Sequence, residues 1–193
     1  MSRRLAVASL TLGLAVVADP AVAEDVYNID PIHSQPMYEI QHMKGISVQH
    51  GSFGKLTGKV ALDRAAKKGT IDVTIDTSTI RSHDARLDSI LKGEDYFNVA
   101  KYPTMTFKSS DLKFDGDNVV GAEGELTMIG VTKPVTLKMT RFTCGENPFN
   151  KKPVCGGEAT ATIKRSDWGM KTGIPVSSGD DVKLILPIEA YKE

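Results

Sequence analysis

Apolar and polar residues alternate with a period of two through most of this chain, and this pattern constrains the fold more than any other feature. In the stretches 56–62, 71–75, 135–139 and 159–163, apolar or small residues occupy every second position, mostly with Thr, Lys or Asp between them. Successive side chains of a strand point to opposite faces. Ile, Val and Thr, which favour strands, make up 40 of residues 24–193. The sequence therefore predicts antiparallel strands with one buried face and one solvated face.

Turn residues divide this pattern into eight or nine strands. Breaks fall at Gly69, at 115–118 and at 177–180, where Gly, Asp, Asn and Ser cluster. The parity of the apolar face changes within 107–112 and again within 139–142. A parity change of this kind predicts a β-bulge or bend, which helps a sheet to curl.

One segment has helical rather than strand spacing. Apolar residues recur at i, i+3 and i+4 from Leu87 to Leu91, with Asp84 in the first turn and Gly93 after the last. These features predict one short α-helix at about 82–92. The chain shows no internal repeat and no linker, so we expect one domain.

A sheet of about eight strands with one apolar face must close on itself or stack on a second sheet. The small residues Gly58, Gly124, Ala159 and Ala161 fall at inward positions and favour a barrel with an unfilled interior over a solid core. From the residues alone, the fold class is all-β, as a barrel or a sandwich.

Residues 1–23 have the features of a secretory signal peptide. Two arginines precede an uncharged, mostly apolar run at 5–17, and a small-x-small triplet at 21–23 offers a cleavage site. A membrane anchor fits less well, because roughly 20 apolar residues are needed to cross a bilayer. We expect a mature chain of residues 24–193 without a transmembrane segment. We expect this chain to be exported, by the Sec route rather than the twin-arginine route.

Composition excludes several classes of function. The 24 basic and 24 acidic residues balance, and no block of like charge occurs. A nucleic-acid-binding protein needs a basic patch that replaces condensed counterions, so no nucleic-acid partner is expected. With 25% charged and 40% apolar residues, the chain is typical of a globular protein rather than a disordered or multi-span one.

The two cysteines, Cys144 and Cys155, are expected to form a disulfide, because export places them in an oxidising compartment. Their spacing suits a cross-link at the base of a hairpin loop. It does not suit a CxxC redox pair or a zinc knuckle. No metal site is predicted: His33 and His42 are nine residues apart, and that odd spacing points them to opposite faces of a strand.

Several segments, taken together and in one order, resemble the YceI-like family of bacterial periplasmic proteins. They span almost the whole chain from residue 27 onward, and no single one is specific alone. The segments are Tyr27-x-Ile29-Asp30-x-x-His33-Ser34, Gly51-x-Phe53-x-x-Leu56-x-Gly58, Asp95-Tyr96-Phe97-Asn98-Val99, Lys101-Tyr102-Pro103, Gly124-x-Leu126-Thr127-x-Ile129-Gly130-Val131-Thr132-Lys133-Pro134-Val135 and Arg165-Ser166-Asp167-Trp168-Gly169-Met170.

The resemblance implies a single extended, lipocalin-like antiparallel barrel over 24–193, with a helix beside it. It implies a carrier that holds a long apolar ligand, such as a polyisoprenoid, a prenylated quinone or a similar lipid, and that often dimerises. It implies no chemistry and no cofactor. One departure is clear: Leu87 and Ile90 stand where the family usually has Arg and His. Head-group contacts made by those two positions are therefore not expected here.

A ligand tunnel requires inward apolar side chains rather than catalytic groups. Plain core packing is the alternative explanation for each candidate. The expected ligand-binding residues are Tyr38, Ile40, Leu56, Val60, Val73, Ile75, Phe107, Leu126, Met128, Leu137, Trp168 and Leu186. Arg165 and Asp167 are expected to pair with each other or to brace a turn around Trp168.

A serine hydrolase and a scaffold protein are the two alternatives to a carrier. Ser52-x-x-Lys55 and the later triplet 171–173, Lys-Thr-Gly, imitate motifs of penicillin-recognising serine hydrolases. The first motif requires a helix, whereas its surroundings predict a strand, so no catalytic residue and no enzyme activity are expected. The other alternative is a stress-related interaction protein that uses the barrel as a scaffold.

Overall fold

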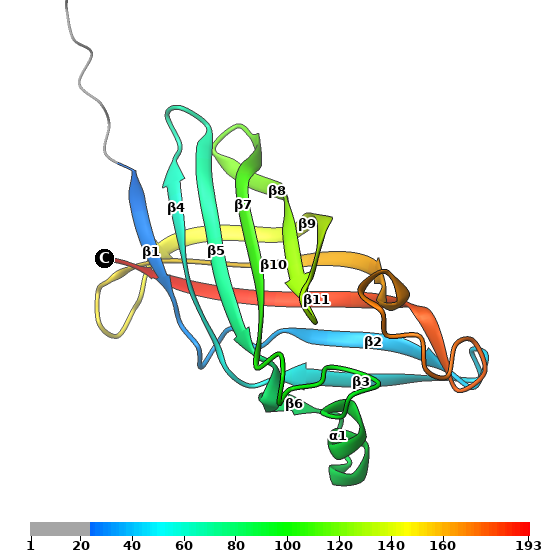
Figure 1. The fold of residues 1–193 in the computed structure, drawn as a ribbon. Helices are drawn as coiled ribbons and strands as arrows, with labels where there is room; N and C mark the ends of the chain where they lie inside the picture. Colours follow the sequence, from blue (N-terminus) through cyan, green and yellow to red (C-terminus); the bar gives the residue numbers. More distant parts are fainter. Residues whose placement is uncertain (1–23) are drawn as a thin grey trace, which may run out of the picture.

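The computed structural model of the chain describes residues 24–193, and the signal-peptide prediction lies outside them. It consists mostly of strands, with one α-helix and two short 3-10 helices (Figure 1). The strands are β1 (Asp25–Ile29), β2 (Met37–His42), β3 (Ser47–Phe53), β4 (Leu56–Asp63), β5 (Lys68–Asp76), β6 (Ile80–Arg81), β7 (Thr104–Asp115), β8 (Asn118–Met128), β9 (Val131–Glu146), β10 (Pro153–Lys164) and β11 (Ser178–Lys192). The helices are η1 (Thr77–Thr79), α1 (Ala85–Leu91) and η2 (Arg165–Trp168).

Eight of these strands close into an antiparallel barrel, which confirms the predicted fold. They follow the order β1-β4-β5-β7-β8-β9-β10-β11, and the pairing of β1 with β11 completes the ring. The long strand β11 has two partners on one side. Its last residues pair with β1, whereas its first half pairs with β2, which continues to β3 and β6. Figure 1 shows β2 and β3 running beside β11 and extending the barrel toward one tip.

Both predicted irregularities are register shifts. The β7–β8 ladder shifts between Lys108 and Asp111, and the β9–β10 ladder shifts between Glu158 and Ala159. Residues 24–193 form eleven strands rather than the eight or nine predicted. The additional strands escape prediction because β1 and β6 are short and β3, with its Gln, His and Gly, lacks clean alternation.

Helix α1 forms where its spacing predicted but begins three residues later than 82. Asp84 is its N-cap, and the carboxylate accepts hydrogen bonds from the amides of Arg86 and Leu87, each at 2.9 Å. The cap fixes the start, since the Asp84 backbone is extended. The helix lies beside β3 and β6 rather than inside the barrel (Figure 1).

The predicted disulfide joins Cys144 on β9 to Cys155 on β10, directly opposite each other in the ladder.

Cys144→Ser is expected to lower the melting temperature under oxidising conditions by roughly 6–12 °C. Closing a loop of this size is worth about 3 kcal/mol, and each kcal/mol shifts the melting temperature of such a chain by about 2–4 °C. Calorimetry with and without reductant measures the effect. The neighbouring exposed Thr143→Ser is the control, and equal melting of all three proteins under oxidising conditions would contradict the expectation.

Candidate functional site

The barrel encloses one large cavity of about 670 Å³, which lies within the range of small-molecule binding sites. Its wall is almost entirely apolar, because the alternating strands direct one set of side chains inward. Leu87, Ile90 and Leu91 of α1 also reach it, although the helix lies outside the ring of strands. The cavity therefore runs from the barrel interior toward α1 and the extension made by β2 and β3.

Eleven of the twelve residues predicted to bind a ligand line this cavity. They are Tyr38, Ile40, Leu56, Val60, Val73, Ile75, Phe107, Leu126, Met128, Leu137 and Leu186. Trp168 is not part of the wall. It is buried at the end of η2 in the same apolar cluster as the wall residues, and its indole nitrogen donates to the carbonyl oxygen of Leu126 at 3.2 Å. Contact of any of these residues with a ligand remains a prediction.

The small residues of the wall are mostly not those predicted. Of the four, only Ala159 lines the cavity, together with Ala122, Gly121, Gly156 and Gly157, which sequence reasoning missed. Ala122 is in phase with Leu126 and Met128 on β8, so alternation along this strand places it on the inner face. Ala161 does not reach the wall.

Gly58 and Gly124 serve close backbone packing instead of leaving space. A Cβ on Gly124 would lie 2.6 Å from the ring of Phe107 and 2.4 Å from the carbonyl oxygen of Lys108. A Cβ on Gly58 would lie 2.3 Å from the carbonyl oxygen of Asp72. Neighbouring strands therefore occupy the volume that these glycines release.

Aromatic rings form the wall nearest α1. Tyr38 packs on Gly51, and its ring centroid lies 6.4 Å from that of Phe53, which in turn meets Phe97 edge-on at 5.4 Å. Burial raises the pKa of Tyr38 to about 12, with a smaller contribution from the carboxylate of Asp88. The hydroxyl is therefore a neutral hydrogen-bond donor throughout the physiological range.

The end of the cavity beside the β2–β3 turn carries polar groups. His42, Gln49, Ser177 and Ser178 all line it there, and His42 pairs in register with Ser178 on β11. Ser177 is exposed, so this end reaches solvent. A ligand with an apolar chain and a polar head would find matching surroundings at this end.

Arg165 is the most buried charged residue of the site, with 4% of its surface exposed. Its guanidinium donates to the carbonyl oxygens of Gly179, Met170 and Thr172 and to Ser178 Oγ, at 2.8–3.0 Å. Burial lowers its pKa. Of the two predicted roles, Arg165 therefore braces the loop between η2 and β11 rather than pairing with Asp167.

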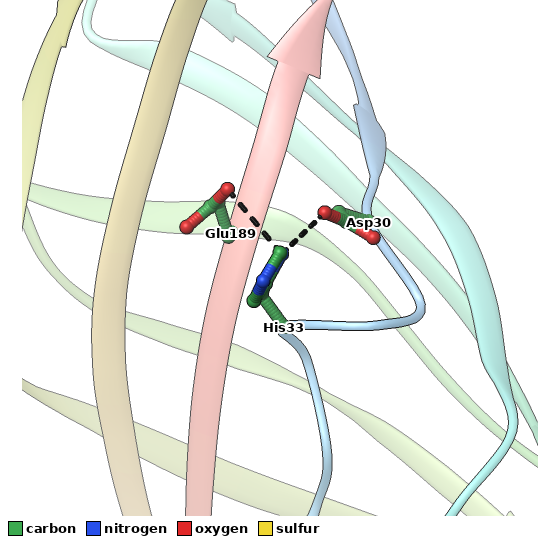
Figure 2. Close-up of side chains that lie close together, drawn as sticks. All are labelled: Asp30, His33 and Glu189. Carbon is green, nitrogen blue, oxygen red and sulfur yellow. Dashed lines mark hydrogen bonds and ion pairs between the residues drawn. The ribbon is translucent and has the colours of Figure 1, made fainter. Parts of the chain in front are cut away.

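At the corner between β1 and β2, Asp30, His33 and Glu189 bring three ligand-type atoms within 4.8 Å of one another (Figure 2). His33 Nδ1 lies 2.7 Å from Asp30 Oδ2 and 3.7 Å from Glu189 Oε1. Buried Ser34 joins the same corner to β11 by bonds to both backbone groups of Glu189. Sequence reasoning missed the cluster, because Glu189 is 156 residues from His33. His42 takes no part in it.

His33 is expected to titrate above the ordinary histidine pKa of about 6.5, since its hydrogen bond to Asp30 favours the charged ring. Burial opposes ionisation of Asp30, but the bonds from His33 and the Ile32 amide outweigh it and lower its pKa. The stability contributed by His33 is thus fully present below its unfolded pKa and lost as the pH rises through the folded pKa. NMR titration should find the raised pKa, and Asp30→Asn should remove it. An unshifted His33 in the wild type would contradict this expectation.

No helix within residues 24–193 has both the length and the apolar character needed to cross a bilayer. Ser52 lies on β3 and Lys55 between two strands, so the hydrolase-like motif does not form a helix.

The fold and the cavity define a class of protein, a hollow antiparallel barrel with an apolar interior that is open to solvent at one end. The model of the YceI-like domain family matches residues 27–190. The chain belongs to the YceI-like family, which confirms the resemblance noted in its motifs.

Known relatives cover nearly all of the chain. Protein YceI of Escherichia coli is 38% identical over 181 residues, 91% of each chain. The crystal structure of BcnA from Burkholderia cenocepacia has a TM-score of 0.72 at 24% identity, covering 83% of this chain and 98% of that one. A polyisoprenoid-binding domain from Saccharophagus degradans has a TM-score of 0.65 at 14% identity, covering 86% and 98%. These two solved structures share the fold.

Proposed function

We propose that this protein is a periplasmic carrier that binds a long apolar molecule inside its barrel. The ligand is a polyisoprenoid, a prenylated quinone or a similar lipid. The observation that carries the proposal is the cavity of about 670 Å³ with its apolar wall. Each CH₂ moved from water into such a wall contributes about 0.8 kcal/mol. Several isoprene units therefore suffice for tight retention, even after the entropy of confining the chain is subtracted. The polyisoprenoid binding of the Saccharophagus degradans domain supports this ligand class.

The proposed location rests on two features. The first 23 residues have the pattern of a cleaved signal peptide, and a disulfide suits an oxidising compartment. The proposed carrier needs no catalytic residue and no cofactor. Its role is the retention of a ligand that is otherwise insoluble in water.

Mass spectrometry tests the proposal. Protein purified natively from its host should release a prenyl lipid into organic solvent. The stripped protein should then bind a short-chain isoprenoid quinone, with quenching of Trp168, whose indole donates to the carbonyl oxygen of the cavity-lining residue Leu126. An empty barrel together with no quenching would overturn the carrier proposal and favour the scaffold alternative.

A further inference from the structure

Four apolar side chains project into solvent at the tip that β2 and β3 form. Met43, Ile46, Val48 and Val176, here called the tip patch, are 52%, 82%, 50% and 63% exposed. Isolated exposed apolar residues are ordinary, but a group of large ones at one point marks an interaction surface.

Hydrogen bonds hold the two segments of the tip patch together. The Met43 amide donates to the carbonyl oxygen of Ser177 at 3.0 Å, which places the β2–β3 turn against the residue following Val176. The Ile46 amide donates to the carbonyl oxygen of Met43 at 3.3 Å and closes the turn. The loop that carries Val176 is itself braced by Arg165 through Thr172 and Ser178. The tip patch is therefore a formed surface and not a loose end.

The two segments that carry the tip patch hold charge of one sign. Residues 40–55 and 168–179 contain no Asp or Glu, although the whole chain has equal numbers of acidic and basic residues. Lys44 and Lys171 are exposed there, and neither forms an ion pair within the described part of the chain. Exposed apolar side chains on segments that carry lysines and no carboxylates match a bilayer surface with anionic headgroups.

The tip patch adjoins the polar end of the cavity. His42 and Ser177, which line that end, are the chain neighbours of Met43 and Val176. A surface resting on the tip patch would thus lie beside the end of the cavity that reaches solvent.

We propose that the tip patch docks on a lipid bilayer with anionic headgroups, so that a ligand passes between bilayer and cavity with little exposure to water. The transfer step rests on the proposed function, whereas docking itself does not. A second copy of the chain fits the patch less well, because a two-fold pairing of tips would bring like-charged lysines together. A bilayer accepts the apolar side chains and neutralises the lysines at the same time.

Vesicle co-sedimentation tests docking without any prenyl lipid. The purified protein should bind vesicles of phosphatidylglycerol and phosphatidylethanolamine, and Ile46→Asp should weaken this binding by roughly tenfold or more, because burying one such side chain is worth at least about 1.5 kcal/mol. Lys44→Gln with Lys171→Gln should weaken it by about tenfold or more. The matched control is Phe149→Asp, which replaces another highly exposed apolar residue, 93% exposed, in the turn after β9.

Each result decides between the possibilities. Absence of vesicle binding by the wild type, or equal weakening by Ile46→Asp and Phe149→Asp, would overturn docking. A wild-type dimer that Ile46→Asp converts to monomer, without vesicle binding, would show a self-association surface instead and would also overturn it. Ile46→Asp should retain quinone binding in detergent solution. Vesicle binding by a protein that binds no quinone would support docking while rejecting the carrier function.

Discussion

Replacing Arg165 with methionine is expected to lower the free energy of unfolding by about 3–5 kcal/mol, because its guanidinium is the shared donor for several buried or half-buried acceptors. The side chains are similar in length, but methionine donates no hydrogen bonds. The substitution leaves the carbonyl oxygens of Met170, Thr172 and Gly179 without their donor. Unpaired buried acceptors cost about 1–3 kcal/mol each, less where water reaches them.

Urea denaturation measures the loss of unfolding free energy, and two further variants provide the comparison. Arg165→Lys should recover only part of the stability, because one ammonium cannot reproduce a planar fork that serves four acceptors. Arg141→Met, at an exposed position on β9, is the matched control and should change stability by less than about 0.5 kcal/mol. If Arg165→Met lowered the free energy of unfolding no more than Arg141→Met does, the bracing role of Arg165 would be wrong.

Ala159→Phe is expected to weaken the binding of an isoprenoid quinone by more than tenfold while leaving the fold intact. Ala159 is 4% exposed, lines the cavity, and stands between Met139 and Leu186, two other residues of the wall. A phenyl ring at this position fills part of the cavity that the proposed ligand would occupy. Excluding only two methylene equivalents removes about 1.6 kcal/mol, which exceeds a factor of ten in affinity.

The same variant distinguishes a hollow barrel from a solid core. In a packed core the added ring would cost about 1–3 kcal/mol of stability. In an open cavity it enters free space, and the cost should stay below about 1 kcal/mol. Quinone titration with Trp168 fluorescence and urea denaturation are the two measurements. Thr162→Phe, on the exposed face of β10, is the matched control. Unchanged affinity in Ala159→Phe would show that the ligand does not occupy this part of the barrel.

Local features of the chain were predictable because their causes lie within a few residues. The alternation in 71–75 determines which side chains of β5 face inward, and Asp84 caps α1 through amides two and three residues away. Both bulges were visible as changes of parity. The disulfide followed from the expected compartment and from a spacing that suits a hairpin. Eleven of the twelve candidate residues line the cavity for the same reason of alternation.

Other features depend on contacts between residues far apart in the chain. Nothing near Trp168 indicates that its indole donates to the carbonyl oxygen of Leu126 and takes no part in the cavity wall. Nothing near His33 indicates that Glu189 completes its cluster. Apolar residues alternate along β11 from Val182 to Ala190, yet the first half of the strand pairs with β2 and only its last residues pair with β1.

The sequence of this protein determined the fold class, the inward faces, the helix and the cross-link, since each is set by periodicity, by a cap or by chain proximity. Tertiary structure alone decided which strands close the ring, how Arg165 is satisfied, and that Met43 and Val176 meet beside the polar end of the cavity. The physical reason is that the hydrophobic effect is non-directional, so the local sequence does not select which distant residues a buried side chain contacts. Alternation specifies that a side chain must leave water, whereas only the closed barrel specifies which distant groups receive it.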